Sequence, residues 1–297
     1  MLQLSDEVKA AVDGGRPVVA LESTLVAHGM PWPENLEVGR AAEEVVRREG
    51  AVPATIAVVR GKLTVGVDGA TLERIARGGF VKTGQADLGP MIAKSGDGAT
   101  TVSATAFAAA RAGITVFATG GIGGVNRGDS GDVSSDLTTL AREPIAVVSA
   151  GAKAILDLPR TLEMLETLGV LVLGFGTDTF PAFYTRSSGL QIEHRAADAA
   201  EAARIIRARF AIGDPRGVLV CNPIPALDEL DPVGIERSIN YALDEAMRAG
   251  VRGKAITPFL LSSIGQATGR RSLAANRALV LDNCRVAARI AVAYARA

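Results

Sequence analysis

The stretch I145-A-V-V-S-A-G-A-K-A-I-L-D157 shows the pattern that decides the fold of this 297-residue chain: an apolar run, then small residues, then polar ones. A short apolar run bounded by turn residues is typical of a strand buried in a parallel sheet. Similar runs alternate with amphipathic or alanine-rich stretches along the chain, and such alternation indicates βαβ units. The sequence therefore predicts an α/β fold with three layers (α/β/α) and a mostly parallel central sheet.

The elements follow from these patterns, although the patterns do not determine the order of the strands. No repeat, low-complexity tract or long linker interrupts the chain, so we expect a single domain over residues 1–297. Residues 175–195 have no clear periodicity and are interpreted as a lid or an oligomer contact. We expect strands at residues 18–21, 55–59, 115–118, 145–148, 171–174 and 218–221, and helices at 34–49, 71–77, 101–112, 134–141, 161–168, 196–208, 234–249 and 273–295.

The composition indicates a small-molecule partner. Lys+Arg and Asp+Glu both number 32, so no net charge attracts the chain to nucleic acid or to an anionic membrane. Aromatic residues make up only 4%, which argues against a base-stacking surface. Cys221 and Cys284 are too few for a disulfide framework or a cysteine-rich zinc site. Because only His28 and His194 are present, oxygen ligands must hold any metal.

The N-terminal ten residues lack the basic and apolar regions of a signal peptide. No apolar stretch reaches the length that a membrane span requires. We therefore expect a cytoplasmic protein without a membrane partner, and the isolated cysteines fit a reducing compartment.

Polar residues that follow strands are the best site candidates, because open α/β sheets bind ligands beyond the carboxyl ends of their strands. Lys153 follows the run at 145–148, where loss of water would favour a neutral amine able to attack a carbonyl carbon. The alternative is a lysine at a helix start whose head group reaches solvent. Glu22 follows the run at 18–21 and could donate a proton if buried, or pair with a buried arginine.

Two further segments allow both a ligand site and a structural explanation. The turn T119-G-G-I-G-G-V-N-R-G128 could bring backbone amides close to an anion, or its glycines could simply permit a tight turn. It lacks the third glycine of a dinucleotide fingerprint, because Asn126 occupies that position. The segment D97-G-A-T-T-V-S-A-T105 could hold a phosphate at a helix start, or its hydroxyls could cap the helix.

Asp132 and Asp136 are four positions apart and would share one face of a helix. Two carboxylates on one face suit a magnesium or manganese ion that keeps several waters. Alternatively, Asp132 or Ser134 caps the following helix without any metal. Lys82 could meet an anion as a point charge or remain solvated.

Several long sequence motifs occur in a fixed order along the chain, and together they resemble those of the pseudouridine-5′-phosphate glycosidase family, which includes indigoidine synthase A-like proteins. The resemblance is collinear from about residue 18 to near the C-terminus. It implies an α/β/α fold, commonly a homotrimer, and a manganese-dependent C-glycosidase that reversibly converts pseudouridine 5′-phosphate to uracil and ribose 5-phosphate. The motifs are A-L-E-S-T from Ala20, H-G-M-P from His28, G-A-T-T-V-S-A-T from Gly98, F-A-T-G-G-I-G-G-V from Phe117, D-V-S-S-D from Asp132, V-S-A-G-A-K-A-I-L-D from Val148, N-P-I-P from Asn222, T-P-F-L-L from Thr257 and S-L-A-A-N from Ser272.

The resemblance also implies roles for single residues. Lys153 falls on the nucleophile, Glu22 on the proton donor and Asp132 on the metal ligand. The remaining positions are expected to contact the substrate or the metal-bound waters: Lys82, Val102, Asn126, Ser134, Ser135, Asp136 and Asn276. We hypothesise that Lys153 attacks C1′ while Glu22 protonates the ring oxygen, and that a water near the metal and Asp136 later hydrolyses the imine.

The chain departs from the family pattern at three places. Asn126 replaces a histidine of the usual G-G-V-H-R-G, and Gln85 and Ala86 replace two arginines of the usual K-V-S-R-R-D. Arg270 stands where a glycine is usual. The first two changes remove cationic groups, so we keep two alternatives open: a related enzyme that forms a carbon–carbon bond or accepts another base or a non-phosphorylated sugar, and a sugar-phosphate-binding protein without catalysis.

Overall fold

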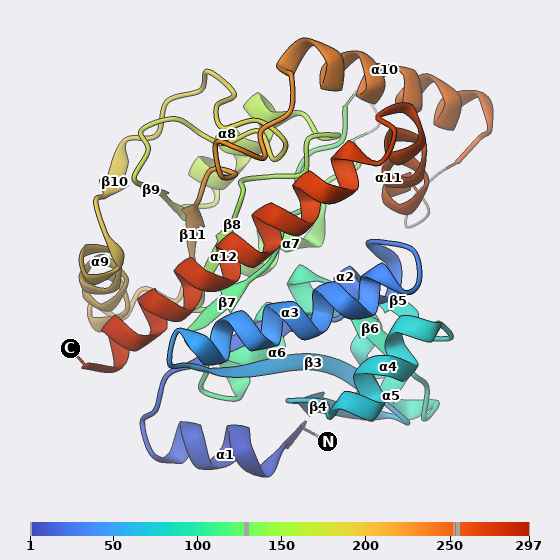
Figure 1. The fold of residues 1–297 in the computed structure, drawn as a ribbon. Helices are drawn as coiled ribbons and strands as arrows, with labels where there is room; N and C mark the ends of the chain where they lie inside the picture. The colour runs from blue at the N-terminus through green and yellow to red at the C-terminus, as the bar shows by residue number, and fades with distance from the viewer. Residues whose placement is uncertain (1, 128–130, 252, 254–255, 297) are drawn as a thin grey trace.

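One large sheet forms the centre of the molecule (Figure 1). The structure is a computed structural model that describes residues 2–127, 131–251, 253 and 256–296. Within those ranges, nine strands follow one another across the sheet in the order β1 (Leu2–Leu4), β4 (Lys62–Val65), β3 (Val52–Val59), β2 (Val18–Glu22), β7 (Val116–Ala118), β8 (Ala146–Ser149), β11 (Val218–Cys221), β9 (Leu171–Phe175) and β10 (His194–Ala196). Strand β6 (Gly98–Thr100) pairs with β3 on one side and with β5 (Val81–Thr83) on the other.

The described strand pairs are parallel, except that β3 runs antiparallel to β4 and to β6. Every residue of β2, β7, β8 and β11 is buried. Strands covered by helices on both faces bury both sets of side chains, which is why their sequences are continuous apolar runs rather than alternating ones. The predicted α/β fold with a mostly parallel sheet is confirmed.

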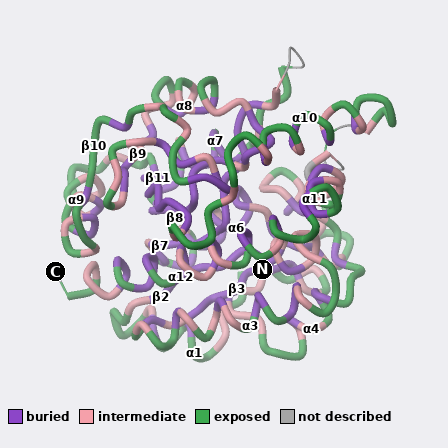
Figure 2. The backbone as a smooth tube through the Cα atoms, turned by 45° about the horizontal axis from the view of Figure 1, so that its top comes forward, coloured by how far each residue is buried: buried purple, intermediate pink, exposed green. Residues whose placement is uncertain are grey.

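Helices flank the sheet on both sides. The long helix α12 (Arg271–Arg296) crosses β2, β7 and β8 beside α3 (Glu34–Arg48), while α6 (Val102–Arg111) packs on the sheet from behind with α7 (Ser135–Leu140) next to it (Figure 1). Figure 2 shows the buried residues gathered between these layers, with exposed residues on the outer faces of the helices. The other helices are α1 (Asp6–Asp13), α2 (Thr24–His28), α4 (Gly69–Arg77), α5 (Leu88–Ala93), α8 (Leu158–Thr167), α9 (Ala199–Ala211), α10 (Pro232–Arg248) and α11 (Ile256–Ala267), with a 3₁₀ turn at Gln85–Asp87.

The predicted strands and helices are all present, with ends that differ by three residues or fewer. The elements that the sequence patterns missed are mostly short. Helices α2 and α5 have five and six residues, too few for an apolar periodicity to emerge. Strand β10 pairs only with β9 and has exposed residues at its first two positions, so it lacks an apolar run.

The segment of residues 175–195 packs against the loop that follows β8. Phe180, Phe183 and Tyr184 are buried, and the rings of Phe183 and Tyr184 meet edge to face with centroids 4.8 Å apart. The Phe183 amide donates a hydrogen bond of 3.2 Å to the Ala150 carbonyl. The segment is thus packed into the fold through these aromatic side chains. Its interpretation as a lid or an oligomer contact stays a prediction.

In the part of the chain that the structure describes, none of the helices combines the length and the apolar character that crossing a bilayer requires.

Candidate active site

The order of the strands brings the carboxyl ends of β2, β7 and β8 side by side. Glu22 is the last residue of β2, Thr119 directly follows β7, and Lys153 follows β8 after a short loop. Parallel strands end at the same edge of a sheet, so three distant parts of the sequence meet there.

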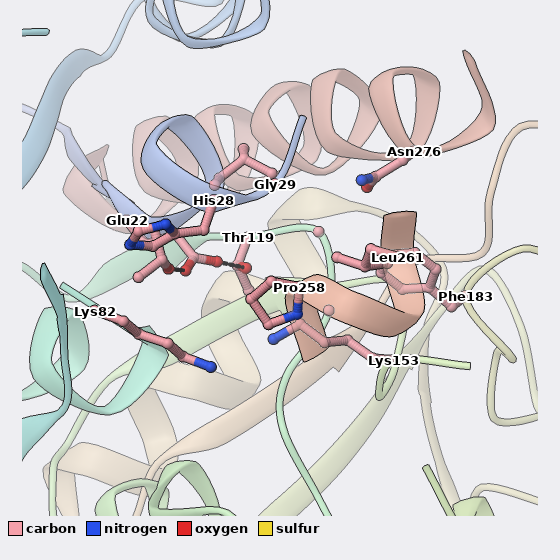
Figure 3. Close-up of a pocket in the computed structure, with 14 residues that line it drawn as sticks. Glu22, His28, Gly29, Lys82, Thr119, Lys153, Phe183, Pro258, Leu261 and Asn276 are labelled. Carbon is pink, nitrogen blue, oxygen red and sulfur yellow. Dashed lines mark hydrogen bonds between the residues drawn. The ribbon is translucent and has the colours of Figure 1, made fainter. Parts of the chain in front are cut away.

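A pocket opens at this edge (Figure 3), with about 560 Å³ of empty space when the part open to solvent is included. Four residues expected from the sequence line it: Glu22, Lys82, Lys153 and Asn276. In Figure 3, Glu22, His28 and Lys82 lie at one end and Asn276, Leu261 and Phe183 at the other, with Lys153 between them. The remaining lining residues are Thr24, Leu25, Gly29, Thr119, Gly120, Gly121 and Pro258.

The Glu22 carboxylate is held by two hydroxyl groups. It is 8% exposed, and it accepts hydrogen bonds from Thr119 Oγ1 at Oε1 and from Thr24 Oγ1 at Oε2. Among the described residues no arginine forms an ion pair with Glu22, so the alternative of an arginine pair is wrong. Because a hydroxyl can both donate and accept, the two threonines can orient this carboxyl group in either protonation state.

Lys153 is half-buried on the loop between β8 and α8. Its amide donates a hydrogen bond of 3.0 Å to the Ile122 carbonyl, and the Ile122 amide donates one of 3.1 Å to the Gly151 carbonyl. These bonds continue the parallel pairing of β7 with β8 beyond the ends of both strands. No helix begins at Lys153, since α8 starts at Leu158, so the helix start in the alternative explanation is wrong. Whether the head group of this half-buried lysine reaches solvent stays open.

The glycine-rich turn after β7 is shaped by close packing. A Cβ at Gly121 would lie 2.7 Å from the Phe183 ring, and one at Gly123 would lie 2.3 Å from Ser134 Oγ. The Gly123 amide is already bonded to Asp136, so this amide does not face an anion. Close packing therefore requires glycine at these two positions, and an anion bound by the other amides of the turn stays a prediction; Gly128 lies outside the described residues.

His28, at the end of α2, was not predicted as a site residue, although it lines the pocket. Its Nε2 atom is buried and has no hydrogen-bond partner among the described residues. Burial lowers the pKa of His28 below its ordinary value of 6.5, the nearby positive charge of Lys82 lowers it further, and a hydrogen bond with the Phe80 backbone raises it in part. The imidazole is thus held in its neutral form at neutral pH.

The opposite end of the pocket is mostly apolar. Phe183, Pro258 and Leu261 line it, and Asn276 reaches it from α12. Asn276 is buried, and its Oδ1 atom finds no hydrogen-bond partner in the described part of the chain. A buried acceptor without a partner is costly, so this end is suited to a flat ligand that donates a hydrogen bond.

The remaining predicted residues form a separate group around the starts of α6 and α7, outside the lining of this pocket. Asp136 is its centre: it is 5% exposed, and its carboxylate accepts the Ser103 amide at 2.9 Å and the Gly123 amide at 2.8 Å. Asp136 thereby joins the first turn of α6 to the glycine-rich turn. Its assignment to the sugar-phosphate and metal-water group stays a prediction.

The expectation that Asp132 and Asp136 share one helical face is wrong. Helix α7 begins at Ser135 with Ser134 as its N-cap, so Asp132 lies on the extended segment before it. The Asp132 carbonyl accepts the Asn126 amide at 3.0 Å, and this pairing places Asn126 against the same segment. The cap at Ser134 is the structural alternative that the sequence allowed.

The start of α6 is also capped from within the protein. The Ser103 amide is bonded to Asp136, and the Ala104 amide to Thr101 Oγ1 at 3.5 Å. Val102 is buried, and Ser135 Oγ donates to Ser103 Oγ at 3.1 Å. Thr101 is thus the helix cap that the sequence allowed, and a phosphate held at this helix start stays a prediction.

The residues that depart from the family pattern also lie outside the pocket lining. Gln85 Oε1 accepts the Thr139 hydroxyl at 2.7 Å, beside α7. Arg270 forms an ion pair with Glu34 on the surface. In the described structure these side chains bond to protein groups rather than line the pocket.

The carboxylates and other donor groups present limit which metal ion this protein could hold. The described residues contain no group of three or more His, Cys, Asp or Glu side chains placed to hold a metal ion. Asp132 is exposed and offers one carboxylate. A single carboxylate fits a divalent ion of the magnesium type that keeps most of its waters, and does not fit an ion that the protein encloses completely.

Two further lining residues escaped the sequence patterns. Thr119 opens the glycine-rich turn, but its role depends on the neighbouring strand that carries Glu22. His28 is one of only two histidines in the chain, and this scarcity was the available signal. Both residues belong to sequence motifs that carry the family resemblance.

Comparison with known proteins agrees with this geometry. A family model described as "Indigoidine synthase A like protein" matches residues 7–293. The chain belongs to this indigoidine synthase A-like family. The predicted family is thereby confirmed over nearly the whole chain.

Curated relatives of this family member carry the name pseudouridine-5′-phosphate glycosidase. The protein from Caldanaerobacter subterraneus subsp. tengcongensis is 53% identical, with 98% of this chain and 96% of the relative covered. Those from Sorangium cellulosum and Myxococcus xanthus are 54% and 51% identical, covering 98% and 100% of this chain and 93% and 99% of the relatives. The prediction that the chain is an enzyme of the glycosidase type is confirmed by these relatives.

Two solved structures have the same fold as this family member. The prealnumycin C-glycosynthase AlnA, in complex with ribulose 5-phosphate, is 40% identical with a TM-score of 0.92, covering 100% of this chain and 97% of the other. An indigoidine synthase A-like protein from Thermotoga maritima is 37% identical with a TM-score of 0.90, covering 98% and 96%.

Proposed function

We propose that this enzyme reversibly cleaves pseudouridine 5′-phosphate into uracil and ribose 5-phosphate, through a covalent intermediate on Lys153. The observation that carries the proposal is that Glu22, at the end of β2, and Lys153, on the loop after β8, line one pocket. An amine and a carboxyl group in one pocket supply a nucleophile and a proton donor, which is the pair that opening a sugar ring requires. The names of the relatives supply the substrate.

The two ends of the pocket suggest how the substrate binds. The uracil ring lies at the apolar end, where Asn276 Oδ1 accepts a ring N–H and Phe183 contacts the ring face. The ribosyl group lies between Lys153 and Glu22, and Lys82 attracts the phosphate as a point charge. This orientation places C1′ close to the Lys153 amine.

The first step opens the sugar. The neutral Lys153 amine attacks C1′ while Glu22 gives a proton to the ring oxygen, so the C1′–O bond breaks and an open-chain adduct forms. This route suits a C-glycoside, which has no leaving-group oxygen for a second carboxyl group to protonate. It is also consistent with the described pocket lining, in which Glu22 is the only carboxylate.

The second step releases the base. The Lys153 nitrogen, positively charged after its attack, first passes a proton to the Glu22 carboxylate. Its lone pair then expels uracil, the C1′–C5 bond breaks, C5 takes up the proton that the nitrogen released, and an iminium remains. Water then adds to C1′, the bond to Lys153 breaks, and ribose 5-phosphate leaves with the amine restored. Asp136 is given no step, because both of its oxygens already accept backbone amides.

We propose a single manganese ion per subunit, bound to Asp132 and otherwise to water. When bound, such an ion supplies positive charge and acidifies its waters. Binding can be measured without turnover, since free manganese gives an electron paramagnetic resonance signal that bound ion loses. Asp132→Asn should abolish this binding, and binding unchanged by the substitution would exclude Asp132 as the ligand.

The test of the function is uracil release from pseudouridine 5′-phosphate, followed by chromatography with manganese present. Lys153→Ala should lower the rate by roughly 10⁴-fold or more, as removal of a covalent nucleophile does. Lys94→Ala is the matched control, because Lys94 is an exposed lysine outside the pocket lining.

Borohydride reduction with ribose 5-phosphate tests the intermediate. We expect a mass adduct on Lys153 in the unsubstituted enzyme and none in Lys153→Ala. Uracil release without an adduct would exclude the Schiff-base route, and no uracil release by the unsubstituted enzyme would exclude the function and leave a sugar-phosphate-binding protein.

A second candidate is carbon–carbon bond formation with another base, which the similarity to the C-glycosynthase favours. The curated glycosidases are more similar in sequence, and Gln85 and Asn126 lie outside the pocket lining, so we place this candidate second. Comparing pseudouridine with its 5′-phosphate, and uracil with other bases in the reverse direction, separates the two. The homotrimer and the cytoplasmic location that the sequence implied also stay proposals, and light scattering against the 30.6 kDa chain mass tests the first.

A further inference from the structure

His28 carries a hydrogen-bonding atom, Nε2, that bonds to no described group. Its Nε2 atom is buried and has no partner, and the residue lines the same pocket as Glu22 and Lys153. The Phe80 backbone favours a proton on the imidazole, and Nε2 is the nitrogen without a partner among the described groups. We therefore assign the proton of the neutral ring to Nδ1 and the lone pair to Nε2.

The surroundings of His28 keep the ring neutral. Burial and the positive charge of Lys82 on β5 disfavour a second proton, while Glu22 on β2, whose oxygens accept threonine hydroxyls, and Lys153 after β8 are the other charged groups of the pocket. A neutral imidazole with its proton on Nδ1 can only accept at Nε2. It cannot donate to a phosphate, whose oxygens are acceptors.

We propose that His28 positions the sugar by accepting a hydrogen bond at Nε2 from the 2′- or 3′-hydroxyl of the ribosyl group. This inference rests on the proposed function, which places the sugar between Lys153 and Glu22. His28 lies at that end of the pocket, away from Asn276 and the apolar residues that face the base (Figure 3). Of the donors on the substrate, the sugar hydroxyls are therefore the ones that His28 meets.

The consequence is selectivity for the hydroxyl. An analogue that lacks the donor leaves Nε2 buried without a partner, and a site built to bond a hydroxyl rejects such analogues strongly. His28 acts as a positioning residue here, because it holds C1′ in line with the Lys153 amine and takes no part in bond breaking.

The experiment compares three substrates: pseudouridine 5′-phosphate and its 2′-deoxy and 3′-deoxy analogues. His28→Ala should lower kcat/KM for the full substrate by about 10- to 100-fold, as loss of one buried hydrogen bond does. For the analogue that lacks the bonded hydroxyl, unsubstituted enzyme and variant should have equal kcat/KM. His28→Gln, whose amide oxygen can reach the place of Nε2, should recover part of the loss.

His194→Ala is the matched control, since His194 is an exposed histidine on β10. Calorimetric binding of ribose 5-phosphate and of its 2-deoxy and 3-deoxy forms repeats the comparison without turnover, and melting temperatures verify that the variants fold. An equal loss on all three substrates, or no loss on any, would overturn the inference. No uracil release by the unsubstituted enzyme would instead refute the proposed function. The binding measurements would then decide the role of His28 by themselves: if His28→Ala weakened the binding of all three sugars equally, that role would be overturned.

Discussion

The Thr119 hydroxyl donates a hydrogen bond to Oε1 of Glu22, although the two residues are 97 positions apart. The contact exists because β7 lies next to β2 in the sheet, so the residue after one strand faces the last residue of the other. In the proposed reaction, this carboxyl group delivers a proton to the sugar. The orientation of Glu22 therefore depends on the pairing of two strands.

Replacing Thr119 by valine should lower kcat by roughly 10-fold with a smaller change in KM, because a general acid must be held within hydrogen-bonding reach of its target. Thr119→Ser keeps the hydroxyl and should retain most of the rate. Steady-state kinetics on pseudouridine 5′-phosphate measure both. Thr139→Val, which removes a buried hydroxyl outside the pocket lining, is the control, and an equal loss in kcat for this variant would refute a specific role of Thr119.

Asp136→Asn should destabilise the protein by about 1–3 kcal/mol, because the amide group can accept only one of the two backbone N–H groups that the carboxylate now accepts. Urea unfolding measures the change. Asp178→Asn, at an exposed carboxylate, should change stability by less than about 0.5 kcal/mol. If Asp136→Asn were as stable as the unsubstituted protein, Asp136 would not be what joins α6 to the glycine-rich turn.

Gly121→Ala should cost about 1–3 kcal/mol and also reduce activity, since the new Cβ would lie 2.7 Å from the buried Phe183 ring that forms the pocket wall. Gly89→Ala provides the comparison. A Cβ at Gly89 meets nothing within 4 Å, so its stability should be unchanged or slightly raised. Thermal melts and kinetics of the two variants check this, and equal behaviour would contradict the packing argument.

Asp214 should make stability depend on acid pH. Hydrogen bonds and the charge of Arg216, with help from Arg209, lower the pKa of Asp214 to about 2. A depressed carboxyl pKa stabilises the fold at any pH above the unfolded value of about 3.9, and this contribution disappears as the pH falls toward the folded value. The difference in unfolding free energy between the unsubstituted protein and Asp214→Asn should thus be constant above about pH 5 and shrink as the pH approaches 2. Urea titrations at pH 7 and pH 3 measure it, and an equal difference at both would contradict the assignment.

Local sequence patterns predicted the strands at 18–21 and 218–221 and the helix at 34–49 closely, because each is long or apolar enough for its period to be visible. Helix α2, with five residues, and the edge strand β10 were missed, because their residues depend on neighbours from elsewhere in the chain. The same division runs through the site. Glu22 and Lys153 could be predicted because each follows a buried strand, whereas Asp132 was wrongly placed on a helix that begins only at Ser135.

The sequence by itself determined that strands alternate with helices, that Glu22 and Lys153 follow buried strands, and which family the chain resembles. These properties are local, because the periodicity of an element and the residues of a sequence motif depend only on neighbouring positions in the chain. Only the tertiary structure decided that β2, β7 and β8 lie side by side, which brings Glu22, Thr119 and Lys153 to one pocket and leaves His28 Nε2 there without a partner. Strand order and burial result from the packing of the whole chain, so no local pattern contains them.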